Sequence, residues 1–123
     1  MGRASEERVH VGVLRLVLTV SGARTLKDRR QTILSIGDRV RHRFPVTWNE
    51  IGTGDDPTRQ TVVMTTASND PRLVRSILDQ CVAMVHAHPV AVAAEVDLDV
   101  FRWHASRESW AARMMAELGT AEE

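Results

Sequence analysis

The pattern of hydrophobic positions predicts, first, a strand that lies near the centre of a sheet. Val9–Val20 is rich in Val and Leu, and both of its alternating sets of positions are largely apolar. A strand that is apolar on both faces is typical of a sheet with both faces covered. The first set is Leu14, Leu16 and Leu18, and the second is Val9, Val11, Val13 and Val17, interrupted by Arg15.

Two helices are predicted from capping signals followed by apolar residues at three- and four-residue spacing. Thr25–Asp28 fits a capping box, and the helix that follows runs to about Arg43, before a proline. Asn69–Pro71 combines an Asx cap with proline at the first helical position, which predicts a second helix that runs to about Ala87. Each helix has one apolar stripe and should therefore pack against the sheet along one side.

Three further strands complete the pattern. We expect them at Val46–Ile51, Gln60–Ser68 and Val90–Arg102, with a loop at Gly52–Thr58 between the first two. The order β-α-β-β-α-β is that of the ferredoxin-like split βαβ fold. The sequence therefore predicts an α+β, ferredoxin-like βαββαβ sandwich.

The two ends of the chain lie outside this core pattern. We expect residues 1–8 to form a loose tail, residues 9–102 the ferredoxin-like domain, and residues 103–123 a helical extension. The extra helix is predicted at about Arg107–Leu118, with Ser106 as its cap and Gly119 as its stop. Its apolar stripe consists of Trp110, Ala111, Met114, Met115 and Leu118.

Composition narrows the class of protein. A chain of 123 residues with 43% apolar and 4% aromatic residues fits one domain with an aliphatic core. The single cysteine, Cys81, allows no internal disulfide, which agrees with a reducing compartment. Residues 1–8 carry two acids and no apolar run, and Val9–Val20 is too short to span a bilayer. We therefore expect a cytoplasmic protein without a membrane segment.

Four short blocks also resemble a known family. His10–Leu16, Gly22–Arg30, Glu50–Gly52 and Ala67–Asp70 together resemble the YlxP-like family of small bacterial proteins of unassigned function, over about residues 9–102. The resemblance implies a ferredoxin-like fold. Because members are often encoded beside ribosome-binding factor A and translation initiation factor two, it also implies a role around RNA or the ribosome. It supplies no catalytic residues.

Two features depart from that family. Its members usually carry a Trp-Gln-Arg or similar segment before the third strand, whereas Asp56–Gln60 here keeps Arg59 and Gln60 but has no Trp. The helix after Trp103 lies beyond the usual end of the family. This helix could give this member a different partner or assembly.

Positive charge is concentrated in one stretch of a chain whose formal charge is zero. Between residues 24 and 43, seven cations face two acids, a formal charge of +5. Such a basic face suits phosphates or an acidic partner, although a merely solvated helix face remains an alternative. We expect the first four residues to contact RNA phosphates and the last three to extend the patch: Arg24, Lys27, Arg29, Arg30, Arg39, Arg41 and Arg43.

The remaining candidates favour structural roles. Cys81 is expected in the core, and the scattered histidines predict no metal site and no cofactor. Arg15 is expected to pair across strands with Glu95, Asp97 or Asp99. We find no catalytic constellation and therefore expect a non-enzymatic protein.

Two other functions stay open. The valine face of the first strand predicts a cover, either the C-terminal helix or a second subunit, so a homodimeric interaction module is the main alternative. Trp48 is the strand aromatic we expect to be exposed, and base stacking as in RRM proteins is disfavoured. Ser21–Arg24 takes the place of the phosphate loop of acylphosphatases but lacks their Gly-x-Val-Gln-Gly pattern, so a phosphate-handling enzyme rests on fold analogy.

Overall fold

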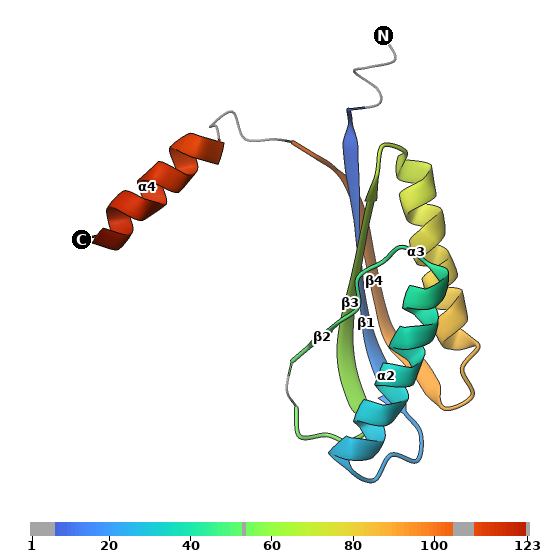
Figure 1. The fold of residues 1–123 in the computed structure, drawn as a ribbon. Helices are drawn as coiled ribbons and strands as arrows, with labels where there is room; N and C mark the ends of the chain where they lie inside the picture. The colour runs from blue at the N-terminus through green and yellow to red at the C-terminus, as the bar shows by residue number, and fades with distance from the viewer. Residues whose placement is uncertain (1–6, 53, 105–109, 123) are drawn as a thin grey trace.

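Two helices pack on one face of an antiparallel sheet, and a third helix stands apart from it (Figure 1). The computed structural model describes residues 7–52, 54–104 and 110–122. Within these residues the sheet has four strands in the order β2-β3-β1-β4. The elements are β1 (Val9–Val20), α2 (Leu26–Arg43), β2 (Asn49–Ile51), β3 (Arg59–Ser68), α3 (Pro71–His86), β4 (Ala91–Trp103) and α4 (Trp110–Glu122).

The strand β1 lies in the middle of the sheet and pairs along most of its length with β3 on one side and β4 on the other. Leu14, for example, lies opposite Met64 of β3 and Leu98 of β4. The predicted α+β, ferredoxin-like order with an extra C-terminal helix is therefore confirmed.

The core lies between the sheet and the two helices α2 and α3. Leu14, Leu16 and Leu18 of β1 are 0% exposed and pack in one cluster with the inner faces of both helices. Gly12 lets α3 come close, because a Cβ atom there would lie 2.5 Å from Val74 Cγ1 and 2.6 Å from Leu78 Cδ1. Burial of this aliphatic surface is the main term that stabilises the fold.

The start of α2 follows the predicted cap. The Thr25 hydroxyl accepts a hydrogen bond from the Asp28 N–H at 3.1 Å, and the Asp28 carboxylate accepts one from the Arg24 N–H at 3.1 Å. Asp28 thus reaches back one residue further than in the standard capping box, in which its partner is the cap residue itself. The helix ends at Arg43, with Phe44 as an extended C-cap before Pro45.

The predicted strand at Val46–Ile51 shortens to Asn49–Ile51. Ahead of it, a Thr47 N–H bond to the Thr65 carbonyl and a bond between the Thr47 and Thr65 hydroxyls replace regular ladder pairing. Trp48 precedes the strand and is half-buried, with its ring packed where a Cβ atom at Gly37 of α2 would lie. The expectation of Trp48 as an exposed sheet aromatic is therefore wrong.

The helix α4 departs from the prediction at its end. It continues through Gly119 to Glu122, and Gly119 does not adopt the positive φ that a glycine helix stop requires. Every residue from Trp110 to Gly119 is exposed, and the helix lies away from the sheet (Figure 1). The predicted cap Ser106, the start of the predicted helix and residues 1–6 of the predicted tail lie outside the described residues.

Candidate functional site

Arg29 lies in the interior and not on the basic surface. Its side chain is 7% exposed, and its Nη1 donates to the carbonyl oxygens of Gly54 at 3.0 Å, Asp56 at 2.7 Å and Arg59 at 3.1 Å. The guanidinium group thereby fixes the loop that leads into β3, which would otherwise leave three carbonyl groups with poorer partners. We therefore assign a structural role to Arg29.

The sequence did contain a signal for this placement. Arg29 precedes Ile33, Ile36 and Val40 at helical spacing, so it belongs to the same stripe as these buried residues. Because Arg29 is charged, its place on the apolar stripe is not evident when the residues of the helix are divided into apolar and basic ones. The prediction of Arg29 as a phosphate contact is thus corrected by the position of its side chain.

Arg24, Lys27 and Arg30 remain exposed at the N-terminal end of α2. None of the three forms an ion pair among the described residues. Arg30 borders a hollow of about 280 Å³, whose lining also includes the carboxylates Glu50 and Asp55. We call Arg24, Lys27 and Arg30 the basic turn. Asp28 in the first turn, and Glu50 and Asp55 beside Arg30, reduce the positive charge of this turn.

The C-terminal cations of α2 do not join the basic turn. At 100° per residue, Arg39 is turned by about 120° from Lys27 around the helix axis and lies about 18 Å further along it. Arg39 and Arg43 border a groove of about 340 Å³ against α3, and the Arg43 guanidinium lies 5.6 Å from the centre of the Phe44 ring. Arg41 is paired with Asp38 at 2.7 Å. The structure therefore divides the predicted seven-residue patch.

The second candidate surface is the face of the sheet opposite to α2 and α3, here called the open face. It is formed by alternate positions of the three long strands: Val9, Val11, Val13, Arg15 and Val17 of β1, Thr61, Val63, Thr65 and Ala67 of β3, and Glu95, Asp97, Asp99, Phe101 and Trp103 of β4. The predicted C-terminal cover does not lie on it, because α4 stands apart (Figure 1).

At the centre of the open face, Arg15 forms the predicted cross-strand pairs. Its Nη1 lies 3.0 Å from a carboxylate oxygen of Glu95 and 3.0 Å from one of Asp97. These two hydrogen bonds raise the pKa of Arg15 further above its ordinary value. Asp99 lies opposite Val13, two residues further along β4 than Asp97, and it forms no ion pair with Arg15. One guanidinium group is thus shared by two carboxylates, and the pairs tie β1 to β4.

Beyond these charges, the open face ends in two exposed aromatic residues. Phe101 lies opposite Val11 and is 41% exposed, and Trp103 lies opposite Val9 and is 52% exposed. Sequence reasoning missed both as sheet aromatics, although their alternation with Asp97 and Asp99 places them on one face. The neighbouring carboxylates repel phosphates, so this face suits a protein better than RNA.

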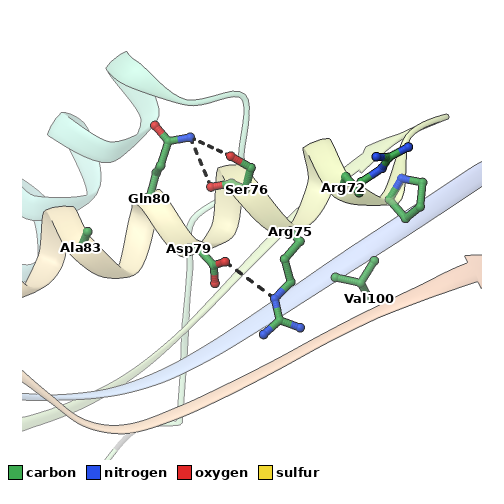
Figure 2. Close-up of a pocket in the computed structure, with 8 residues that line it drawn as sticks. Arg72, Arg75, Ser76, Asp79, Gln80, Ala83 and Val100 are labelled. Atoms are coloured by element: carbon green, nitrogen blue, oxygen red, sulfur yellow. Dashed lines mark hydrogen bonds and ion pairs between the residues drawn. The ribbon is translucent and has the colours of Figure 1, made fainter.

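Another hollow, of about 730 Å³, lies along the outer side of α3 next to Val100 of β4 (Figure 2). Four of its five polar side chains are engaged with one another, and the exception is Arg72. Arg75 Nε lies 3.7 Å from an Asp79 carboxylate oxygen, and the Gln80 amide donates to the Ser76 carbonyl and hydroxyl (Figure 2). The hollow is open and exposed, and it gathers no pair of groups suited to acid–base or nucleophilic chemistry.

The other residues with reactive or metal-binding side chains also give no sign of a reactive site. Cys81 is buried in the core as predicted, and burial raises the pKa of its thiol to about 11, which disfavours a thiolate nucleophile. Among residues 7–52, 54–104 and 110–122, no three His, Cys, Asp or Glu side chains are placed to hold a metal ion. Within the same residues, no helix combines the length and hydropathy that a membrane crossing requires.

Residues 11–98 match the model of a family described as a protein of unknown function, DUF503. The chain belongs to this family. The match includes the whole of α2 and α3, but it ends before Phe101, Trp103 and α4. The aromatic end of the open face and the C-terminal helix therefore lie outside the part of the chain that the DUF503 model describes.

The other comparisons add no function to the DUF503 match. No curated protein matches the chain. The de novo designed protein Foldit4 is similar at 9% identity and a TM-score of 0.42, over 80% of this chain and 99% of that one. The de novo designed protein LFR1 1, with a ferredoxin fold, is similar at 14% identity and a TM-score of 0.33, over 84% and 90% of the two chains.

Proposed function

We propose that this DUF503 protein is a non-enzymatic cytoplasmic accessory protein that contacts RNA, free or in the ribosome, through the basic turn. The observation that carries the proposal is the exposure of Arg24, Lys27 and Arg30 without an ion pair among the described residues. The resemblance to the YlxP-like family implies the same setting. Arg29 is left out because its guanidinium group holds the loop before β3.

The position of the basic turn favours anions for a second reason. It surrounds the N-terminus of an 18-residue helix, where the helix dipole places partial positive charge. Arg39 and Arg43 lie on another flank of α2, next to α3, so we assign them at most a weak, long-range contribution. Arg41 is paired with Asp38 and contributes less still.

Three cations set the expected strength of such binding. Each phosphate contact releases counterions, so three contacts on single-stranded RNA predict a slope of log K against log salt of about −2. Binding should be weak, tolerant of sequence and strongly dependent on salt. It would be a backbone contact that positions the protein, and not one that reads bases.

The test compares two variants with the same change in charge. In one, Arg24, Lys27 and Arg30 are changed to Glu; in the control, Arg39, Arg43 and Arg72 are changed to Glu. Fluorescence anisotropy with a labelled single-stranded RNA at several salt concentrations gives the affinity and its salt slope. We expect the first variant to lose about tenfold or more in affinity and most of the slope, and the control to lose about threefold or less.

Each other outcome has a clear meaning. Equal losses in both variants would show attraction by net charge and no contact at the basic turn. Undiminished binding by the first variant would overturn the proposal. Thermal unfolding of both variants serves as the check on folding, since substitutions at exposed positions usually change the free energy of unfolding by about 0.5 kcal/mol or less.

A further inference from the structure

The open face combines an apolar end with a central Arg15 whose charge is already paired. Val9, Val11 and Val13 are half-buried, and Phe101 and Trp103 project beside them from β4. The Arg15 group satisfies its own hydrogen bonds within one chain. A face of this kind can be covered by another protein surface without leaving an unpaired Arg15, which would oppose burial.

A matching surface exists on the same chain. The α4 stripe (Trp110, Ala111, Met114, Met115 and Leu118) is exposed, with Trp110 at 76% and Met115 at 70%. A helix of 13 residues is marginal in water unless a packing surface supports its apolar side. In the single chain α4 stands off the sheet, so neither apolar surface covers the other (Figure 1).

We infer that a second copy of this chain covers the open face, and that the protein is a homodimer in which the α4 stripe of each copy packs on the apolar end of the open face of the other. The interface is isologous, because the same two surfaces are used twice around one twofold axis. The inference is independent of RNA binding, since the basic turn takes no part in it.

The two exchanged helices set the size of this interface. The helix α4 is about 20 Å long, so its apolar side presents roughly 200 Å² and covers about as much of the sheet beneath it. The open face has room for it, because strands of 12, 10 and 13 residues present roughly 500 Å² at about 3.3 Å per residue and about 4.8 Å between strands. Each copy therefore buries roughly 400 Å², or about 800 Å² in total, which is the size of a weak, concentration-dependent interface.

Charge argues for a protein partner on this face and against RNA. The open face carries Glu95, Asp97 and Asp99 against one central cation, Arg15. A phosphate backbone would meet net negative charge beside the aromatic pair, whereas Trp110 and Met115 of another copy would not. Exposed Trp, Phe and Met are the residue types enriched in protein interfaces.

Sedimentation equilibrium of the full chain tests the inference with three single variants. Phe101→Asp places a charge in the open face, Trp110→Asp places one in the α4 stripe, and Leu34→Asp is the control on the exposed, 57% accessible side of α2. We expect the wild type and the control to dimerise as the concentration rises toward about 100 μM. Each of the other two variants should weaken dimerisation at least tenfold.

Mixing the two defective variants tests the exchange of helices. A heterodimer of Phe101→Asp and Trp110→Asp retains one intact pair, the wild-type α4 of the first on the wild-type sheet of the second. Each homodimer retains none. An equimolar mixture should therefore associate more strongly than either variant alone. Trp103→Asp replaces Phe101→Asp if the latter is shown by circular dichroism to be unfolded.

Three outcomes would overturn the inference. The first is a wild type that is still monomeric at about 100 μM, a concentration at which even a weak specific dimer should be populated. The second is a mixture no more associated than its parts, which would mean that α4 covers its own sheet or none. The third is equal loss of the dimer in Leu34→Asp.

Discussion

The two faces of the sheet begin with similar sequences and end in different environments. On one side of β1, Leu14, Leu16 and Leu18 are 0% exposed beneath α2 and α3. On the other side, Val9, Val11 and Val13 are half-buried on a face that none of the described helices covers (Figure 1). The difference shows that apolar residues on a sheet face favour its burial, but the connections between the strands determine which face the helices cover.

Topology supplies one cover because the connections from β1 and β3 each pass through a helix on the same side. Right-handed crossover connections return the chain to the sheet on one face, so α2 and α3 are adjacent. Of the described elements, α4 is the one left that could cover the open face, and otherwise another molecule must do so. Exposure of the centre of this face to water costs little free energy, because the charged groups of Arg15, Glu95 and Asp97 are well solvated there.

The largest expected contrast between the two faces is in thiol reactivity. Val13→Cys places a thiol on the open face while Cys81 stays buried with its pKa raised to about 11. At pH 8 a thiol with an ordinary pKa is roughly a quarter thiolate and Cys81 about 0.1%, so we expect two labelling phases that differ by at least about 100-fold. Labelling with a chromogenic disulfide reagent measures both.

This contrast also reports on the cover of the open face. A fast phase that slows as protein concentration rises would show that association protects residue 13. Two equally slow phases at the lowest concentration would mean that α4 of the same chain covers the face. Two equally fast phases would break the comparison itself, because Cys81 would then not be enclosed.

The fold could be predicted because local signals and long-range pairing agree. The spacing of Ile33, Ile36 and Val40 and the Thr25 cap define α2, and the confirmed strand Val9–Val20 lies at the centre of the sheet. Where a prediction from the sequence was wrong, the structure has another local arrangement in place of the expected one. The Thr47 hydroxyl pairing with Thr65 takes the place of regular strand pairing, and α4 passes through Gly119 because no left-handed cap forms.

The candidate site was harder to predict than the fold. Charge in a sequence window does not say where each side chain points, and helical periodicity separates Arg29, which is buried, from Arg30, which is exposed. The pairing of Arg15 with Glu95 and Asp97 was predictable because antiparallel neighbours bring opposite charges together. The exposure of Phe101 and Trp103 followed from the same alternation but needed the register of β4 against β1.

A matched pair of valines tests the same contrast in free energy. Val62 and Val63 are neighbours on β3, but Val62 is 0% exposed and Val63 is half-buried on the open face. Val62→Ala should lower the free energy of unfolding by about 2–3 kcal/mol, through two lost methyl groups and a cavity. Val63→Ala should cost less than about 1 kcal/mol.

Urea unfolding at low protein concentration measures both values. Similar losses for the two variants would contradict the assignment of one covered and one open face. A loss for Val63→Ala that grows with protein concentration would sharpen the comparison, because it would place residue 63 inside an interface that forms by association.

The smallest expected effect on stability concerns Asp56, in the loop before β3, which contacts groups on both sides of the sheet. Asp56 borders a hollow with Arg15 and Glu95 of the open face, while its carbonyl accepts from Arg29 on the covered side. Its carboxylate accepts from the Thr58 hydroxyl at 2.6 Å and the Thr58 N–H at 2.8 Å. These bonds, with smaller contributions from Arg59 and Arg29, hold the pKa of Asp56 below its ordinary 3.8.

The sign of the pH dependence follows from that direction. A folded-state pKa below the unfolded value means that the ionised carboxylate stabilises the loop above pH of about 4, and that this contribution is lost as pH falls through the lowered pKa. The Tm difference between the wild type and Asp56→Asn should thus be constant, at most a few degrees, from pH 7 to 5 and shrink toward pH 2. Asp55→Asn, whose carboxylate has no hydrogen bond among the described residues, is the control. A difference that persists at pH 2 would show that the shape of the loop, and not the charge of Asp56, ties the covered face to the open one.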